Sequence, residues 1–251
     1  MARTALITGA TSGIGRETAR LLANSGLRVI ICGRREERLV ELERELKVIT
    51  DVFSLTFDVR DNEKVVDAVD NLPGNWKDID VLINCAGNAH GMDSIEKGDV
   101  NDWDAMLDIN VKGLLYVTKA ILKGMVERKA GHIVNIGSIA GKEVYPNGNI
   151  YCASKFAVDA ISNSMRIDLN KFGIKVSSIN PGLVQTEFSE VRFKGDKERA
   201  KSVYEGFVPL TASDIAEVIL FAVTRPFHVN ISDLNILPTA QANATLVNKS
   251  Y

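Results

Sequence analysis

Three side chains near the middle of the chain have the types and the spacing for proton transfer. Tyr151 and Lys155 lie four positions apart in the stretch YCASK, which places both on one face of a helix. A phenol, with an ordinary pKa of about 10, is a poor base at neutral pH, but an ammonium group one turn away stabilises its phenolate. Ser138, thirteen residues before the tyrosine, could hold a substrate oxygen by a hydrogen bond. Such a pair taken alone is more often solvated, so the elements around it decide the interpretation.

Apolar runs rich in valine and isoleucine alternate with segments of helical period along the chain. Strands are expected near 4–8, 28–33, 54–59, 80–84, 132–138, 175–180 and 234–238, and helices near 13–26, 35–47, 61–72, 101–128, 149–172 and 212–224. Continuous apolar strands between helices are typical of a parallel sheet covered on both faces. We therefore predict one α/β domain over residues 1–251, a doubly wound parallel sheet with helices on both faces. The charged, irregular stretch 185–210 is predicted to be a substrate lid, because structureless loops of that length are otherwise uncommon.

The composition excludes several classes of protein. A formal net charge of −2 over 251 residues provides no basic field for nucleic acid. No run approaches the ~18 apolar residues of a membrane helix. The three cysteines are far apart and lack metal-ligand spacing, so we expect free thiols in a reducing compartment and no metal site. The expectation is a cytoplasmic protein that binds neither nucleic acid nor membranes.

The stretch TGATSGIG (8–15) lies where the first expected strand turns into the first helix. Glycine at position 13 would let the backbone approach a phosphate, and the positive end of the following helix would face a pyrophosphate. A tight turn between a strand and a helix is the simpler alternative, but the position favours a dinucleotide site. The cofactor contacts expected in this loop are Gly9, Thr11, Ser12, Gly13, Ile14 and Gly15.

The end of the second expected strand indicates which cofactor binds. NAD sites carry an acidic residue there for the ribose 2′-hydroxyl, about 20 residues past the glycines. This chain instead has Arg34 and Arg35, with no carboxylate on the strand end. Guanidinium groups suit a 2′-phosphate, so we predict NADP(H), with Arg34 making the first contact. The alternative is a solvated pair that opens the next helix, close to Glu36 and Glu37.

Two further strand ends carry candidate cofactor contacts. Asp58 could reach the adenine amino group and Val59 could add a backbone contact, although Asp58 would serve almost equally well as a helix N-cap. The stretch NCAG (84–87) ends the fourth strand at the crevice where ligands bind open sheets, but a plain turn from strand to loop would also explain it. The contacts expected there are Asn84, Ala86 and Gly87.

In this order and spacing, TGATSGIG, NCAG, YCASK and INPGLVQT resemble the short-chain dehydrogenase/reductase family over about residues 2–240. The resemblance implies a Rossmann-like sheet of about seven strands, a homotetramer or homodimer, and hydride transfer at a CH–OH group with Tyr151 as general acid or base. It also implies that Asn110 holds a water next to Lys155 for proton relay. The further implied cofactor contacts are Tyr151, Lys155, Pro181, Gly182, Val184 and Thr186.

More local stretches indicate a substrate class. Residues 87–94, 182–196 and 225–232 are similar to the bacterial and yeast NADP-dependent 3-hydroxy acid dehydrogenases of that family. The similarity implies serine, L-allo-threonine, 3-hydroxypropionate or malonic semialdehyde as substrate, held by Ser138 and Tyr151. A carboxylate needs a cation, and Arg192 is preferred to Lys194 for its bidentate fork, although both could be solvated lid charges. Pocket-lining candidates are His90, Met92, Tyr145 and Asn149, although each could equally well be a packing or loop residue.

Two other functions remain open. One is a carbonyl reductase of the same family for another small aldehyde or ketone, such as sulfoacetaldehyde or a diketone. The other is a non-catalytic protein that senses NADP. The second would have no need of the tyrosine and lysine, whereas Ser138, Tyr151, Lys155 and Asn110 are all present. The sequence therefore favours an enzyme.

Overall fold

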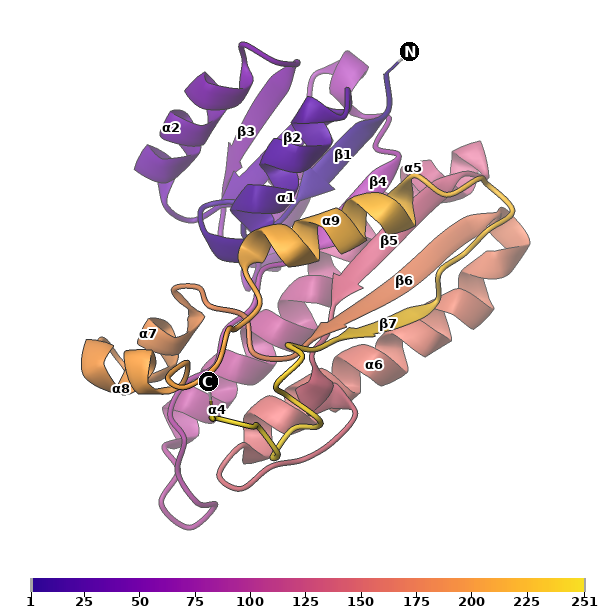
Figure 1. Ribbon diagram of the computed structural model, residues 1–251. Helices are drawn as coiled ribbons and strands as arrows, with labels where there is room; N and C mark the ends of the chain where they lie inside the picture. The colour runs from indigo at the N-terminus through magenta and orange to yellow at the C-terminus, as the bar shows by residue number, and fades with distance from the viewer. Residues whose placement is uncertain (1, 251) are drawn as a thin grey trace.

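The computed structural model describes residues 2–250, and its core is one parallel sheet of seven strands (Figure 1). The strands are β1 Thr4–Ile7, β2 Arg28–Gly33, β3 Val52–Thr56, β4 Val81–Asn84, β5 Gly131–Ile136, β6 Ile174–Pro181 and β7 Asp233–Ile236. Their order in the sheet is β3-β2-β1-β4-β5-β6-β7, and every neighbouring pair is parallel. The order reverses between β1 and β4, which opens a crevice at their carboxyl ends. The predicted doubly wound sheet is confirmed.

Helices cover both faces of the sheet, which explains why its strands are apolar without alternation. One face carries α1 Gly13–Asn24, α2 Glu36–Leu46 and α9 Ala212–Val223, and the other carries α3 Asn62–Asp70, α5 Gly113–Arg128 and α6 Asn149–Leu169 (Figure 1). In β1 the side chain of Ile7 packs in the first layer and that of Leu6 in the second, and both are fully buried. The two apolar layers hold the carboxyl ends of the strands in fixed positions.

Three predicted elements differ from the structure. The helix expected over 101–128 is divided into α4 Val100–Leu107, a π-helical turn Asp108–Lys112, and α5. Such a turn inserts an extra residue and often marks a functional site, and here it contains Asn110. The strand expected at 54–59 is β3 and ends at Thr56, so Asp58 and Val59 lie in the following loop. The strand expected at 132–138 is β5 and ends at Ile136, so Ser138 lies beyond it.

The predicted lid is not a structureless loop. It contains two short helices, α7 Phe188–Arg192 and α8 Lys197–Ser202. Asp196 caps α8 by accepting a hydrogen bond from the backbone N–H of Arg199 at 3.0 Å. These helices are only five and six residues long, which is too short for a helical period to be recognised in the sequence. The many charged residues of the segment instead indicated an irregular loop.

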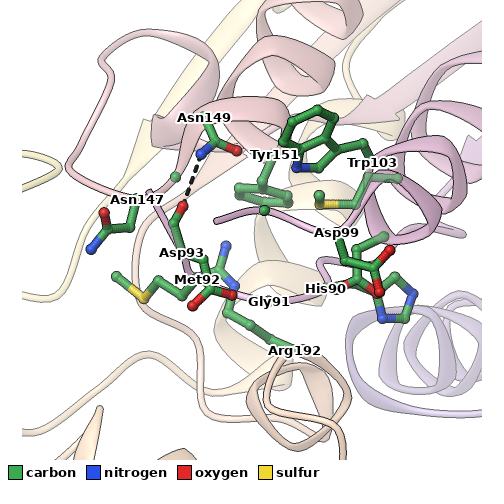
Figure 2. Close-up of a pocket in the computed structure, with 14 residues that line it drawn as sticks. His90, Gly91, Met92, Asp93, Asp99, Trp103, Asn147, Asn149, Tyr151 and Arg192 are labelled. Atoms are coloured by element: carbon green, nitrogen blue, oxygen red, sulfur yellow. Dashed lines mark hydrogen bonds between the residues drawn. The ribbon is translucent and has the colours of Figure 1, made fainter. Parts of the chain in front are cut away.

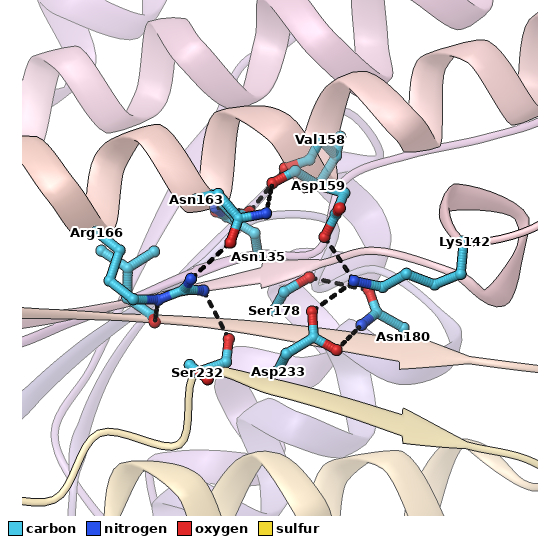
Figure 3. Close-up of polar contacts among 12 residues, drawn as sticks. Asn135, Lys142, Val158, Asp159, Asn163, Arg166, Ser178, Asn180, Ser232 and Asp233 are labelled. Atoms are coloured by element: carbon cyan, nitrogen blue, oxygen red, sulfur yellow. Dashed lines mark hydrogen bonds and ion pairs between the residues drawn. The ribbon is translucent and has the colours of Figure 1, made fainter.

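Lys142 ties the segment that carries Ser138 to the helix that carries Tyr151. Ser138 begins a 3₁₀ turn, and its hydroxyl accepts a hydrogen bond from the Ala140 amide at 3.1 Å. At the end of this turn the Lys142 ammonium pairs with Asp159 of α6 and Asp233 of β7, each at 2.6 Å (Figure 3). This partly buried triad fixes the turn against both elements.

None of the helices within residues 2–250 is long and apolar enough to span a membrane. The same residues contain no cluster of acidic, histidine and cysteine side chains able to hold a metal ion.

Candidate active site

A cavity of about 710 Å³ lies at the carboxyl ends of the strands. Most of the predicted site residues line it, although they come from segments far apart in the chain. They are Gly9, Thr11, Ser12, Gly13, Ile14, Gly15, Arg34, Arg35, Asp58, Val59, Ala86, Gly87, Ser138, Tyr151, Lys155, Pro181, Gly182, Val184, Thr186 and Arg192. Asn84 and Asn110 are not among the lining residues.

The proton-transfer group is assembled from two elements. Tyr151 and Lys155 project from α6, and Ser138 faces them from the turn after β5. Burial raises the pKa of Tyr151, while the charge of Arg192 and a hydrogen bond with Ser138 act in the opposite direction. Ser138 is therefore next to the phenol, as the sequence predicted.

Lys155 is buried and donates to the Ile136 carbonyl oxygen at 2.9 Å. Burial lowers the pKa of this ammonium to about 8. Its Nζ lies 5.9 Å from the centre of the Tyr151 ring, whereas Cζ of Arg192 lies at 4.7 Å. Arg192, which the sequence suggested only as a substrate-binding cation, is thus also a second positive charge next to the tyrosine.

Asn110 lies behind the cavity wall. Its Oδ1 accepts from the Asn88 amide at 2.9 Å, and its Nδ2 donates to the Asn88 carbonyl oxygen at 2.8 Å and to Ser154 Oγ at 3.0 Å. A Cβ on Gly87 would lie 3.0 Å from Asn110 Oδ1 and 3.8 Å from Lys155 Nζ. The side chains of Asn110 and Lys155 therefore both lie close to the backbone at Gly87. The role of Asn110 in a water relay stays a prediction.

The glycine loop leaves the start of α1 available to an anion. Ser12 is the N-cap residue of this helix, but its side chain does not cap the helix; its Oγ accepts from Arg35 Nη2 at 2.7 Å. Gly13 has a φ of +50° at the entrance of α1, and a Cβ there would press on Thr186 at 3.3 Å. Amides without a side-chain cap and a close backbone approach are what a pyrophosphate requires.

The two arginines after β2 have different surroundings. Arg35 donates from Nε to Thr11 Oγ1 at 3.0 Å and from Nη2 to the same oxygen at 2.8 Å. Its Nη1 pairs with Glu187 at 2.9 Å. Arg34 is 55 % exposed, with a single ionic partner within residues 2–250, Asp58 at 3.5 Å. Arg34 therefore has more free donors for a phosphate than Arg35, and the predicted order of contact with the cofactor stays a prediction.

Asp58 does not cap a helix. Its carboxylate accepts from the Arg60 guanidinium at 2.7 Å and from the Arg60 amide at 3.0 Å. The N-cap of α3 is Asp61, which accepts from the amide of Lys64 at 3.2 Å. The capping alternative is therefore wrong, because the chain continues three residues beyond Asp58 before the helix starts.

The side chain of Asn84 points into the core between β4 and its neighbours. Its Nδ2 donates to Thr118 Oγ1 and to Asn135 Oδ1, each at 2.9 Å. The residue is buried, at 4 % exposure. Asn84 is the last residue of β4, and the alternation of side chains along a strand directs it into the core. Ala86 and Gly87 lie in the loop beyond the strand and line the cavity.

The substrate end of the cavity is bounded by the lid and by the loop before α4. Arg192 of α7 lies beside Tyr151 in a small pocket with His90 and Met92, and Asn149 of α6 donates to the Asp93 carbonyl oxygen at 2.9 Å on its rim (Figure 2). The amide of Gly91 donates to the Arg192 carbonyl oxygen at 2.9 Å, which joins the lid to that loop.

Arg192 and Lys194 have different orientations. The Arg192 guanidinium contacts the rings of Tyr151 and Phe188, with Cζ at 4.7 and 5.3 Å from their centres. Its Nε is buried without an acceptor among residues 2–250. Lys194 instead pairs with Asp102 at 2.9 Å and does not line the cavity. Arg192 is thus the lid cation that is available to an anionic ligand there.

Among the lining residues that were not identified from the sequence, three make contacts that shape the cavity. Glu187 pairs with Arg35 and with Arg38, the latter at 2.6 Å, and so joins the lid to α2. Phe188 packs against Tyr151 with ring centres 5.6 Å apart. Gln241, near the C-terminus, accepts from the Leu183 amide at 2.9 Å. All three depend on contacts across more than thirty positions, which no local pattern encodes.

Known proteins resemble this chain in sequence and in structure over most of its length. The model of the short chain dehydrogenase family matches residues 3–197. The NADP-dependent 3-hydroxy acid dehydrogenase YdfG of Salmonella typhi is 46% identical over 242 residues, which cover 96% of this chain and 97% of that protein. Sulfoacetaldehyde reductase 2 of Chromohalobacter salexigens is 43% identical over 238 residues, 94% of each chain.

Among solved structures, the closed form of a serine dehydrogenase complexed with NADP+ superimposes with a TM-score of 0.93. It is 45% identical in sequence, and the match covers 97% of this chain and 98% of that one. The fold and the sequence similarity therefore agree.

Proposed function

This chain belongs to the short-chain dehydrogenase family, and from that premise we propose that it is an NADP(H)-dependent oxidoreductase for small 3-hydroxy acids. The proposed reaction interconverts serine, L-allo-threonine or 3-hydroxypropionate with the corresponding 3-oxo acid or semialdehyde. The observation that carries the proposal is that one cavity is lined by Ser138, Tyr151, Lys155 and Arg192 together with the glycine loop.

The residues present fit NADP(H). The start of α1 has no side-chain cap, so its amides are available to a pyrophosphate. Gly13 has no side chain that would crowd Thr186 at the entrance of this helix. Arg34 provides an exposed guanidinium for a 2′-phosphate, which a carboxylate at the same place would repel. Bound there, NADP(H) accepts or supplies the hydride. We therefore propose that the cofactor contacts predicted from the sequence bind NADP(H), with the exception of the Asn84 side chain, which does not line the cavity.

The protein side chains handle the proton. Ser138 donates a hydrogen bond to the substrate oxygen and holds it next to Tyr151. In the oxidative direction, the Tyr151 phenolate removes the hydroxyl proton; in the reductive direction, the phenol returns a proton to the same oxygen. The positive charge of Arg192 and the hydrogen bond with Ser138 favour the phenolate, which counteracts the effect of burial on the pKa of Tyr151.

Arg192 supports the assignment to acids. Its guanidinium lines the cavity beside Tyr151, where a substrate carboxylate would pair with the positive charge. A sulfonate would pair with it as well, and a relative 43% identical is a sulfoacetaldehyde reductase. A reductase for sulfoacetaldehyde is therefore the second candidate.

The decisive experiment follows NADPH oxidation at 340 nm with malonic semialdehyde and with sulfoacetaldehyde, and NADP+ reduction with serine, L-allo-threonine and 3-hydroxypropionate. NADH and NAD+ serve as the matched controls. The proposal expects turnover of the carboxylic acids with the phosphorylated cofactor. Preference for sulfoacetaldehyde would favour the second candidate, and turnover of neutral dicarbonyls alone would reject both.

The proposed assembly is a homotetramer or homodimer in the cytoplasm. Exposed apolar side chains on α5 and α6 support self-association; they include Leu115, Phe156 and Ile167, at 38, 41 and 77% exposure. The three unpaired cysteines agree with a reducing compartment. Light scattering coupled to size exclusion would determine the number of subunits.

A further inference from the structure

Tyr145 lies next to Arg192 on the wall of the cavity. It belongs to the loop between the Ser138 turn and α6, and it lines the same space as Ser138 and Tyr151. The Nη2 of Arg192 donates to the Tyr145 hydroxyl oxygen at 2.7 Å. The hydroxyl and the guanidinium are thus neighbours at the substrate end of the site.

The Tyr145 hydroxyl still has a proton to give. A phenol can accept one hydrogen bond and donate another, and no acceptor for its hydrogen lies within bonding distance in the described part of the chain. Burial raises the pKa of Tyr145, so the group keeps its proton throughout the working range of pH. The Arg192 guanidinium lines the same cavity, so a neutral donor and a positive charge lie side by side on one wall.

The turn before α6 holds the Tyr145 ring in place. The Gly148 amide donates to the Tyr145 carbonyl oxygen at 3.1 Å. A Cβ at position 148 would collide with the ring at Cε2. Close packing of glycine against the ring fixes the direction of the hydroxyl, and such pre-organisation lowers the entropic cost of binding a ligand.

We propose that Tyr145 determines substrate specificity: its hydroxyl donates a hydrogen bond to the carboxylate of a 3-hydroxy acid, beside the guanidinium of Arg192. The inference rests on the proposed function and adds a second carboxylate-binding group to it.

The test compares two substrates in one variant. Tyr145→Phe removes the hydroxyl and keeps the ring, so packing against Gly148 is retained. NADP+ reduction is measured with 3-hydroxypropionate and with its methyl ester, which has the same hydroxyl and no carboxylate charge. Tyr116→Phe, at a position on α5 that does not line the cavity, is the control for loss of a phenol hydroxyl. NADP+ affinity is measured for each variant by fluorescence quenching.

The expected result is a fall in kcat/KM of about tenfold or more for the acid, from loss of a hydrogen bond to a charged group, and less than twofold for the ester. NADP+ affinity stays unchanged. Equal losses on acid and ester would assign Tyr145 a structural role and overturn the inference, as would undiminished turnover of the acid. Absence of acid turnover in the wild-type enzyme would refute the proposed function itself.

Discussion

Replacement of Arg192 by glutamine should shift the pH dependence of alcohol oxidation. The guanidinium Cζ lies 4.7 Å from the centre of the Tyr151 ring. A unit charge at that distance stabilises a phenolate by about 0.9 kcal/mol at a dielectric constant of 80 and about 3.5 kcal/mol at 20, or roughly 0.6 to 2.6 pKa units. Because a cation lowers the pKa of a phenol, its removal raises that pKa.

The assay measures kcat for oxidation of 1,3-propanediol at saturating NADP+ across the pH range. This substrate lacks a carboxylate, so loss of anion binding does not obscure the result. The acid limb of the profile should move to higher pH by roughly 0.6 to 2.6 units in Arg192→Gln. Arg192→Lys retains the charge and should leave the limb near its original position. An unshifted limb in Arg192→Gln would show that Arg192 does not act on Tyr151.

Three further predictions concern the proton donor, the cofactor and the core. Tyr151→Phe should retain NADPH binding, seen by fluorescence, and lose at least about 100-fold in kcat; undiminished turnover would exclude the phenolate. Arg34→Ala should raise KM about tenfold or more for NADPH and leave that for NADH unchanged, and equal effects on both cofactors would contradict a 2′-phosphate contact. Burial lowers the pKa of His132 to about 3, so the folded protein keeps the imidazole neutral and loses stability as pH falls below about 6.5. Urea unfolding should show about 2 kcal/mol less stability from this group at pH 5 than at neutral pH, a difference that His132→Gln removes; the same loss in that variant would assign it to other groups.

Local signals in the sequence were sufficient for the sheet and for much of the cavity. The glycine loop, the arginines after β2 and the Tyr151–Lys155 pair are each contained within one turn or helix, and fold topology brings strand ends together. Apolar runs identified every strand, with errors of a few residues at β3 and β5. Those errors arise because pairing partners, rather than composition, decide where a strand ends.

The contacts between the lid and the rest of the cavity could not be predicted in the same way. Arg192 reaches Tyr145 across 47 positions, and Glu187 reaches Arg35 across 152. Tertiary packing decides whether a cation of the lid faces solvent, an aspartate or the cavity. Arg192 and Lys194 belong to the same short segment, yet Arg192 lines the cavity and Lys194 pairs with Asp102. The position of Asn110 is another such case, since its side chain contacts the Asn88 backbone and Ser154, 22 and 44 positions away.

The most direct test of the central claim is isotopic. The enzyme would be incubated with NADP+ and 3-hydroxypropionate that carries deuterium on carbon 3, and the reduced cofactor analysed by mass spectrometry. Wild type should form NADPH one mass unit heavier than the unlabelled cofactor, and Tyr151→Phe should form it at least about 100-fold more slowly. Formation of unlabelled NADPH, or no reduced cofactor at all, would contradict hydride transfer from the hydroxyl-bearing carbon.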